Sequence, residues 1–245
     1  MRRFISTRRI RAAAVTSVLV LLSWACSGPP EPSETSVVPM ATPDGAVAED
    51  VRIVVLGNSI AAGLGLPEDQ AFPAVLEQQL IDAGHSVRVV NAGVSGDTSA
   101  GGLRRIEWLL QQNPDLVVVE LGGNDALRGQ PLEAIEGNLR GIVRKTRAAG
   151  ARVLLLGMDV PTNYGPDYGE GFAAVYDRIA ADEGVELVPG FMREVGVAPD
   201  LMQPDGLHPT AKGQQKLAEQ VFPAVEALVV EIAGQGGTST DEGNG

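Results

Sequence analysis

The 245-residue chain has little of several things that would point to particular protein classes. It has a single cysteine, so no disulfide can form within the chain and stability must come from core packing. Aromatic residues make up only 4% of the sequence, whereas hydrophobic residues of all kinds make up 44%. This balance favours a sizeable core packed from aliphatic strands and helices over an aromatic-rich sandwich.

Positive charge is scarce outside the first 25 residues. That segment holds five of the 19 Lys and Arg residues and no acidic residue. The rest of the chain therefore carries 31 acidic residues against 14 basic ones, a formal charge of −17. A surface this acidic repels a phosphate backbone, so no nucleic-acid partner is expected.

The N-terminus has the order of a secretory signal peptide, with a cationic opening, an apolar run from Ala12 to Leu22 and then Ser23 to Ala25. The apolar run is too short to span a bilayer, which takes about 20 residues. The sole cysteine, Cys26, follows, and the whole segment resembles a bacterial lipoprotein signal, in which that cysteine becomes the lipid-modified first residue. This predicts a lipoprotein-type signal peptide over residues 1–25 and an exported protein anchored to the membrane at the cell envelope. Plain secretion is the alternative.

Polar segments flank one predicted domain. Residues 26–50 and 234–245 are rich in small and polar residues and lack apolar periodicity, which predicts a disordered tether and a disordered tail. The folded domain is predicted over residues 51–233.

Strand and helix patterns alternate within this domain. Unbroken apolar runs predict strands buried on both faces at residues 52–57, 86–93, 115–123, 152–158 and 185–189. Amphipathic stretches predict helices at residues 71–83, 99–113, 132–149, 171–183 and 211–232. This alternation predicts an α/β fold with a central parallel sheet of about five strands and helices on both faces. Ligands bind beyond the carboxyl ends of the strands in such sheets.

Polar clusters lie where these strands end. Residues 57–59 (GNS) follow the first strand, 95–98 (SGDT) the second and 122–125 (GGND) the third. Asp205 and His208 lie in the stretch DGLHPTAKG before the last helix. Because parallel strands end at one edge of the sheet, we expect these clusters to converge.

Ser59 could cap a following helix or act as a nucleophile. A serine hydroxyl becomes a good nucleophile when a base accepts its proton, and histidine suits that role near neutral pH. Of the two histidines, His85 in AGHSV is most simply a solvated loop residue. His208 follows Asp205 by three residues, a spacing at which the carboxylate can hold one ring nitrogen while the other faces Ser59. The alternative is that Asp205 and His208 form a capped loop entering the last helix.

Acyl transfer also needs hydrogen-bond donors for the oxyanion. The candidates are the backbone N–H groups of Ser59 and Gly96 and the side-chain amide of Asn124. Glycine suits such a place because a substrate can approach its backbone closely. The structural alternatives are a turn role for Gly96 and a cap role for Asn124.

The blocks GNSI, SGDT, GGND and DGLH resemble, in this order, the four sequence blocks of the SGNH or GDSL-type esterase family. The surrounding sequence is similar to the bacterial subgroup of multifunctional acyl-CoA thioesterases, arylesterases and lysophospholipases, over nearly the whole of residues 51–228. The resemblance implies a three-layer α/β/α flavodoxin-like fold, a triad of Ser59, His208 and Asp205, and an oxyanion hole from Ser59, Gly96 and Asn124. Asn58 departs from the pattern, which has Asp there, and we expect it to affect local hydrogen bonding rather than abolish the chemistry.

Together these patterns predict a serine esterase that hydrolyses ester or thioester bonds of small acyl substrates through an acyl-enzyme intermediate. No metal or organic cofactor is expected, because the sequence has no Cys/His ligand cluster. A carbohydrate O-acetylesterase and a non-catalytic, lipid-anchored binding protein are the alternatives. Residues 125–130 and the loop 161–168, with Tyr164 and Tyr168, are candidates to line an acyl groove.

Overall fold

The computed structural model describes residues 50–160 and 165–236. The chain divides into the units Met1–Ala46 and Val47–Gly245, and the first unit lies wholly outside the described residues. Cys26 and Tyr164 also lie outside them. The predictions for the signal peptide, the tether and the lipid anchor therefore stay predictions.

Five parallel strands form one sheet in the order β2-β1-β3-β4-β5. They are β1 (Val51–Gly57), β2 (Val87–Gly93), β3 (Leu116–Glu120), β4 (Arg152–Leu156) and β5 (Glu186–Val188). Each coincides with a predicted strand, although the third and fourth end a few residues earlier than predicted. The prediction of a five-stranded parallel sheet is confirmed.

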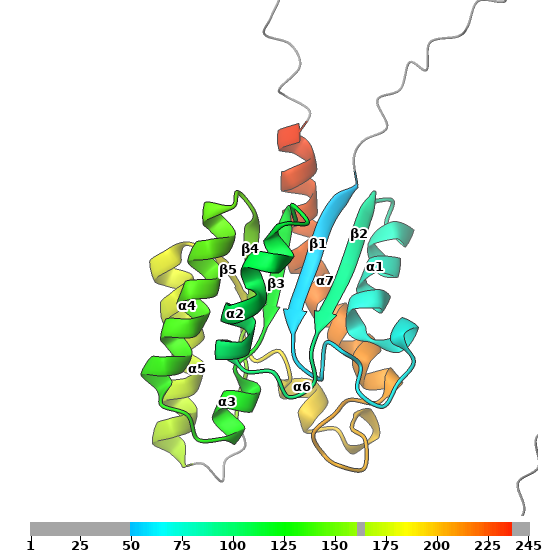
Figure 1. Cartoon of the computed structure of the whole chain (residues 1–245). Coiled ribbons are helices and arrows are strands. Elements are labelled where there is room, and N and C mark those ends of the chain that lie inside the picture. The colour runs from blue at the N-terminus through cyan, green and yellow to red at the C-terminus, as the bar shows by residue number, and fades with distance from the viewer. Residues whose placement is uncertain (1–49, 161–164, 237–245) are drawn as a thin grey trace, which may run out of the picture. The chain divides into compact units, whose positions relative to one another are not determined.

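Helices cover both faces of the sheet and complete three layers (Figure 1). Helices α1 (Phe72–Asp82) and α7 (Ala211–Gly236) contact each other on one face. Helices α2 (Ser99–Leu110), α4 (Leu132–Ala148) and α5 (Pro166–Glu183) lie in a row on the other. This is the three-layer α/β/α arrangement, with the strand order of flavodoxin-like sheets. In the part of the chain that the structure describes, no helix has both the length and the apolar character to cross a membrane.

The helices differ from the prediction in two ways. Helix α5 begins at Pro166 instead of residue 171, and α7 ends at Gly236 instead of residue 232. Proline suits the first turn of α5 because the N–H that it lacks would have no partner there. The sequence also does not predict the short elements α3 (Gly123–Leu127), α6 (Arg193–Gly196), η1 (Glu68–Gln70) and η3 (Pro199–Leu201), which are too short to show an apolar period.

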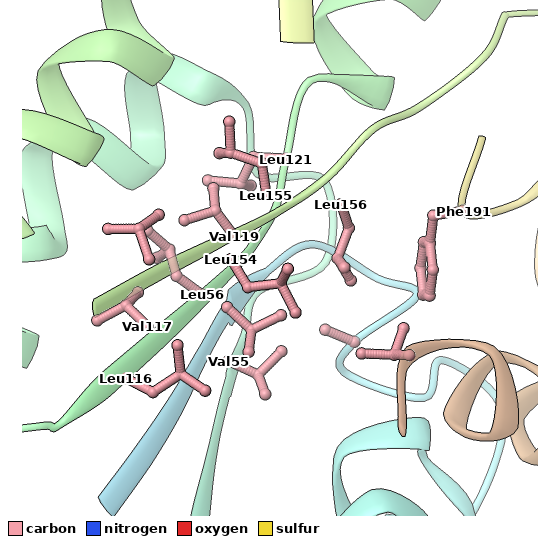
Figure 2. Close-up of a cluster of buried hydrophobic side chains, with 14 of the residues drawn as sticks. Val55, Leu56, Leu116, Val117, Val119, Leu121, Leu154, Leu155, Leu156 and Phe191 are labelled. Carbon is pink, nitrogen blue, oxygen red and sulfur yellow. The ribbon is translucent and has the colours of Figure 1, made fainter. Parts of the chain in front are cut away.

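The hydrophobic core lies between the sheet and its helix layers. All five residues of β3 are buried, and Figure 2 shows side chains of β1, β3 and β4 gathered there, among them Leu56, Val119 and Leu155. Phe191, also in this cluster, packs edge-to-face against Phe72 of α1 with ring centroids 5.3 Å apart. Burial on both faces explains why these strands are continuous apolar runs instead of alternating ones.

The sheet order creates a switch point at the carboxyl ends of β1 and β3. From β1 the chain crosses to β2 on one side, and from β2 it returns to β3 on the other. The two crossover helices, α1 and α2, lie on opposite faces, so a crevice opens at these strand ends. The start of β1 and the end of α7 lie at the opposite edge of the sheet, at the top of Figure 1.

Candidate active site

Ser59 lies in the turn that follows β1, at the switch point. Residues 60–65 continue as turns and no α-helix begins here, so Ser59 does not cap a helix. Asn58 organises the turn, because its Oδ1 accepts a hydrogen bond from the Ile60 N–H at 2.9 Å. The Ser59 hydroxyl lies 3.5 Å from the same Asn58 Oδ1 and has a second, closer partner.

That partner is His208, and the two join Asp205 in one hydrogen-bonded row. His208 Nε2 lies 2.8 Å from Ser59 Oγ, and His208 Nδ1 lies 2.7 Å from Asp205 Oδ2. The Asp205 carboxylate also accepts hydrogen bonds from the backbone N–H groups of Leu207 and His208. The bond from the His208 ring, followed by these two, lowers the pKa of Asp205 to about 2. An ionised Asp205 keeps the proton on Nδ1, so Nε2 is free to accept the proton of Ser59.

The loop that presents His208 is folded back on itself. Met202 and Pro209 form an antiparallel bridge across it, and the Gln203 N–H donates to the His208 carbonyl oxygen at 2.7 Å. The Gln203 side chain donates to the carbonyl oxygens of Leu64 and Pro209. Gln203 thereby ties the histidine loop to the turn that carries the serine.

Helix α7 has its own cap. Thr210 Oγ1 accepts a hydrogen bond from the Gly213 N–H at 3.2 Å, in the first turn of the helix. Asp205 binds His208 and the loop backbone instead. Asp205 and His208 thus do form a capped loop before α7, but Asp205 also binds the His208 ring, and the helix itself is capped by Thr210.

The predicted oxyanion donors are only partly gathered at one place. Asn124, in α3, lines the same cavity as Ser59 and His208, whereas Gly96 is not among the residues lining it. The two are nevertheless linked, because Asn124 Nδ2 donates to the carbonyl oxygen of Asp97 at 2.9 Å. Gly96 has a φ of +80°, which favours glycine. Within the described residues, the backbone N–H groups of Ser59 and Gly96 have no hydrogen-bond acceptor.

Arg105 of α2 supports this loop, and the sequence reasoning missed it. Its guanidinium donates to the carbonyl oxygen of Gly57 at 2.9 Å and of Ala92 at 2.6 Å, at the ends of β1 and β2. Its Nε donates to the Asp97 carboxylate at 2.8 Å. Arg105 thus joins the ends of two strands to the loop that holds Gly96. Its partners are mostly backbone atoms, which leave no signal in the sequence.

Glu120, the last residue of β3, is a second missed residue and is fully buried. Its Oε2 accepts hydrogen bonds from the backbone N–H groups of Asn58 at 2.9 Å and Ala61 at 3.3 Å. Its Oε1 accepts one from Asn58 Nδ2 at 2.7 Å. Burial raises the pKa of Glu120 to about 8, and these hydrogen bonds oppose the rise. The available signal was an acidic residue closing the buried apolar run LVVVE.

A cavity of about 720 Å³ opens beside Ser59 and His208. Its walls are mainly apolar, with contributions from Leu127, Met158, Val160, Ala173, Met192 and Met202. Leu127 belongs to the predicted groove segment 125–130, but Tyr168 does not line the cavity: it stacks on Phe172, and its hydroxyl donates to the Gln130 carbonyl oxygen. No cluster of His, Cys, Asp and Glu in the described part of the chain could hold a metal ion.

Comparison with known proteins gives consistent matches. Residues 55–216 match the GDSL-like Lipase/Acylhydrolase family. The chain is 49% identical over 178 residues to "Esterase TesA" of Pseudomonas aeruginosa, covering 72% of this chain and 89% of that protein. It is 41% identical over 185 residues to "Thioesterase 1/protease 1/lysophospholipase L1" of Escherichia coli, covering 75% of this chain and 87% of that one. Among solved structures, the psychrotrophic esterase EstA of Pseudoalteromonas, inhibited by monoethylphosphonate, is 34% identical with a TM-score of 0.71, covering 74% of this chain and all of that one.

Proposed function

The chain belongs to the GDSL-like lipase/acylhydrolase family and is an ester-hydrolysing enzyme, and we propose that Ser59, His208 and Asp205 are its catalytic triad. One observation carries this assignment: the continuous hydrogen-bonded row from Ser59 Oγ through both ring nitrogens of His208 to Asp205. It supports the proposal because a hydroxyl attacks efficiently only when a base can take its proton.

In the first half of the reaction, Ser59 Oγ attacks the carbonyl carbon of the substrate while its proton passes to His208 Nε2. Asp205 stabilises the resulting imidazolium. The tetrahedral intermediate then collapses, the bond to the leaving oxygen or sulfur breaks, and His208 returns the proton to the leaving alcohol or thiol. In the second half, water attacks the acyl carbon while its proton passes to His208 Nε2. The bond between Ser59 Oγ and the acyl carbon then breaks, His208 returns the proton to Ser59 Oγ, and the carboxylic acid leaves.

The developing negative charge is on the former carbonyl oxygen. We assign its stabilisation to the N–H groups of Ser59 and Gly96 and to the Asn124 amide. Two observations support this assignment: both N–H groups lack an acceptor among the described residues, and Asn124 uses one of its two amide hydrogens on Asp97 and keeps the other. Such donors act on charge that develops in the transition state.

The proposed substrates are acyl esters and thioesters whose acyl chain enters the apolar cavity. Its volume of about 720 Å³ lies within the usual range of small-molecule sites, and methionine and valine side chains supply the walls. The acyl group of an O-acetylesterase substrate has only two carbons, and the apolar walls of this cavity suit a longer acyl chain better than a carbohydrate. A p-nitrophenyl ester series should show kcat/KM rising from the acetate to longer acyl chains, and a maximum at the acetate would favour the acetylesterase instead.

The triad is tested by Ser59→Ala. This variant should lose hydrolysis of p-nitrophenyl butyrate and labelling by a fluorophosphonate probe, with an unchanged unfolding temperature. Ser86→Ala is the matched control, because Ser86 directly precedes the first residue of β2, at the strand ends far from the cavity, and its hydroxyl bonds Asp50. Ser86→Ala should keep both the hydrolysis and the labelling. Turnover retained by Ser59→Ala would exclude this serine as the nucleophile.

We also propose that the protein is exported and held at the cell envelope by a lipid on Cys26. The support is the order of a cationic opening, a short apolar run and the chain's sole cysteine. Mass spectrometry of the mature N-terminus should find a lipid-modified Cys26. Cys26→Ser should release the protein from the membrane fraction. An unmodified mature N-terminus at another residue would contradict the anchor.

A further inference from the structure

The turn that carries Ser59 rests on a buried carboxyl group that takes no part in the proposed chemistry. Glu120 is fully buried, and its register partner on the neighbouring strand is Gly57. A Cβ on Gly57 would lie 2.7 Å from Glu120 Oε2 and 2.4 Å from the Ala61 Cβ. The glycine therefore leaves the space in which the carboxyl group reaches the turn.

The carboxyl group holds the turn on both sides of the serine. Glu120 Oε2 accepts the backbone N–H groups of Asn58 and Ala61, which flank Ser59 in the chain. Both bonds fix the peptide backbone next to the serine, and one oxygen accepts both of them. A carboxylate or a neutral carbonyl oxygen can make such bonds.

The amide of Asn58 completes this contact. Asn58 is 2% exposed, and its Nδ2 donates to Glu120 Oε1 while its Oδ1 accepts the Ile60 N–H. An ionised aspartate at position 58 would have no donor to offer Glu120, and would bring two carboxyl groups together in a buried place. Asn58 is also the position where this chain departs from the GDSL pattern.

We propose that Glu120 and Asn58 are a positioning pair: the carboxyl group holds the Ser59 turn in its reactive geometry, and the Asn58 amide is the donor matched to it. Glu120 acts through the turn, and the Asn58 Nδ2 that bonds it is turned away from Ser59, whereas Asn58 Oδ1 lies 3.5 Å from Ser59 Oγ. The inference rests on the proposed function, in which Ser59 is the nucleophile and its N–H an oxyanion donor.

The pair can be tested by exchanging which of the two side chains donates the hydrogen bond and which accepts it. In Glu120→Gln one oxygen remains for the two backbone N–H groups, but the new amide faces the Asn58 amide, donor against donor. We expect kcat for p-nitrophenyl butyrate, measured above pH 8 where Glu120 is ionised, to fall about tenfold, the equivalent of one lost hydrogen bond, with KM nearly unchanged. In the double variant Asn58→Asp with Glu120→Gln, the new amide on β3 donates to the new carboxylate in the turn. The original bond is thereby restored with donor and acceptor exchanged, and kcat should recover.

Turnover is expressed per site labelled by the fluorophosphonate probe. A merely structural role for Glu120 predicts fewer labelled sites with normal turnover at each. A positioning role predicts the normal number of labelled sites, a slow rate of labelling and a low turnover at each labelled site. Glu77→Gln is the matched control, because Glu77 Oε1 also accepts a backbone N–H, that of Val89 at 2.7 Å, away from the cavity. Its turnover per labelled site should equal that of the unmodified enzyme.

The proposal is overturned if Glu120→Gln keeps normal turnover per labelled site, or if the double variant is no better than Glu120→Gln. If Glu120→Gln cannot be obtained folded, Asn58→Ala takes its place, since it keeps the carboxyl group and removes only the amide. Normal turnover in Asn58→Ala would then overturn the proposal. Failure of the proposed function is distinguished by the labelling itself, because a probe that labels the enzyme elsewhere than Ser59 rejects the nucleophile and not the pair.

Discussion

At the scale of single residues, the site combines side chains proposed to carry out the chemistry with side chains that hold the backbone around them. Ser59, Asp205 and His208 were predictable, because only a few residue types activate a hydroxyl and the chain has two histidines. Glu120 and Arg105 were not, because they act on backbone atoms of residues far away in the sequence. The predicted effect of Asn58 on local hydrogen bonding agrees with its bonds to Glu120 and Ile60.

Asn124 gives a prediction at this scale. Asn124→Ala removes the proposed side-chain donor to the oxyanion, and kcat for p-nitrophenyl butyrate should fall by roughly 10²-fold. Steady-state kinetics measure this, with the unfolding temperature as a check on the fold. Asn138→Ala is the control, because this amide bonds Ser99 and does not line the cavity, and it should lower kcat far less. Equal losses in the two variants would contradict the oxyanion role.

At the scale of helices and strands, apolar runs predicted the sheet well. Buried parallel strands must be apolar on both faces, so their signal survives in a single sequence. The start of α5 and the whole of α3 did not follow from the sequence. Helix α3 has five residues, of which Asn124 and Asp125 are polar, and it is held by tertiary contacts such as the Ser99 hydroxyl bonding Asp125 at 2.6 Å. Such contacts are set by the fold and not by local pattern.

Helix α7 provides the prediction at this scale. Thr210→Ala removes the hydroxyl that accepts the Gly213 N–H and should lower the free energy of unfolding by about 1 kcal/mol. Urea denaturation measures the change. Thr210→Ser keeps a hydroxyl and should restore most of the stability. If alanine and serine give the same stability at this position, Thr210 is not the cap.

At the scale of the whole molecule, topology brings the site together. Ser59 and His208 are 149 residues apart, and the switch point between β1 and β3 makes their meeting possible. The alternating pattern of strands and helices predicted this edge of the sheet, and with it the convergence of the serine, histidine and aspartate. It did not predict the shape of the cavity, because side chains such as Met192 and Met202 enter it from irregular segments.

The fold also makes its stability depend on pH through Glu120. Its pKa is raised from 4.5 to about 8. Below about pH 4.5 the carboxyl group is protonated in both the folded and unfolded states, so the stability that Glu120 contributes is fully present. Between these values the folded state holds a proton that the unfolded state has lost, so the free energy of unfolding falls as the pH rises, by up to about 1.4 kcal/mol per pH unit.

Urea denaturation at pH 5.5 and 7.5 should therefore show a loss of stability that Glu120→Gln largely removes. Glu186→Gln is the control, because Glu186 is exposed on β5, and it should keep the full dependence. A loss of stability in Glu120→Gln as large as in the unmodified enzyme would assign the pH dependence to other groups.

Both ends of the described domain leave from the edge of the sheet opposite to the cavity. A resin, a sensor surface or a fusion partner joined at either end of this domain is therefore attached on the side away from the cavity. The opening of the cavity then faces the solvent, so immobilisation by either end leaves the path of incoming reagents clear.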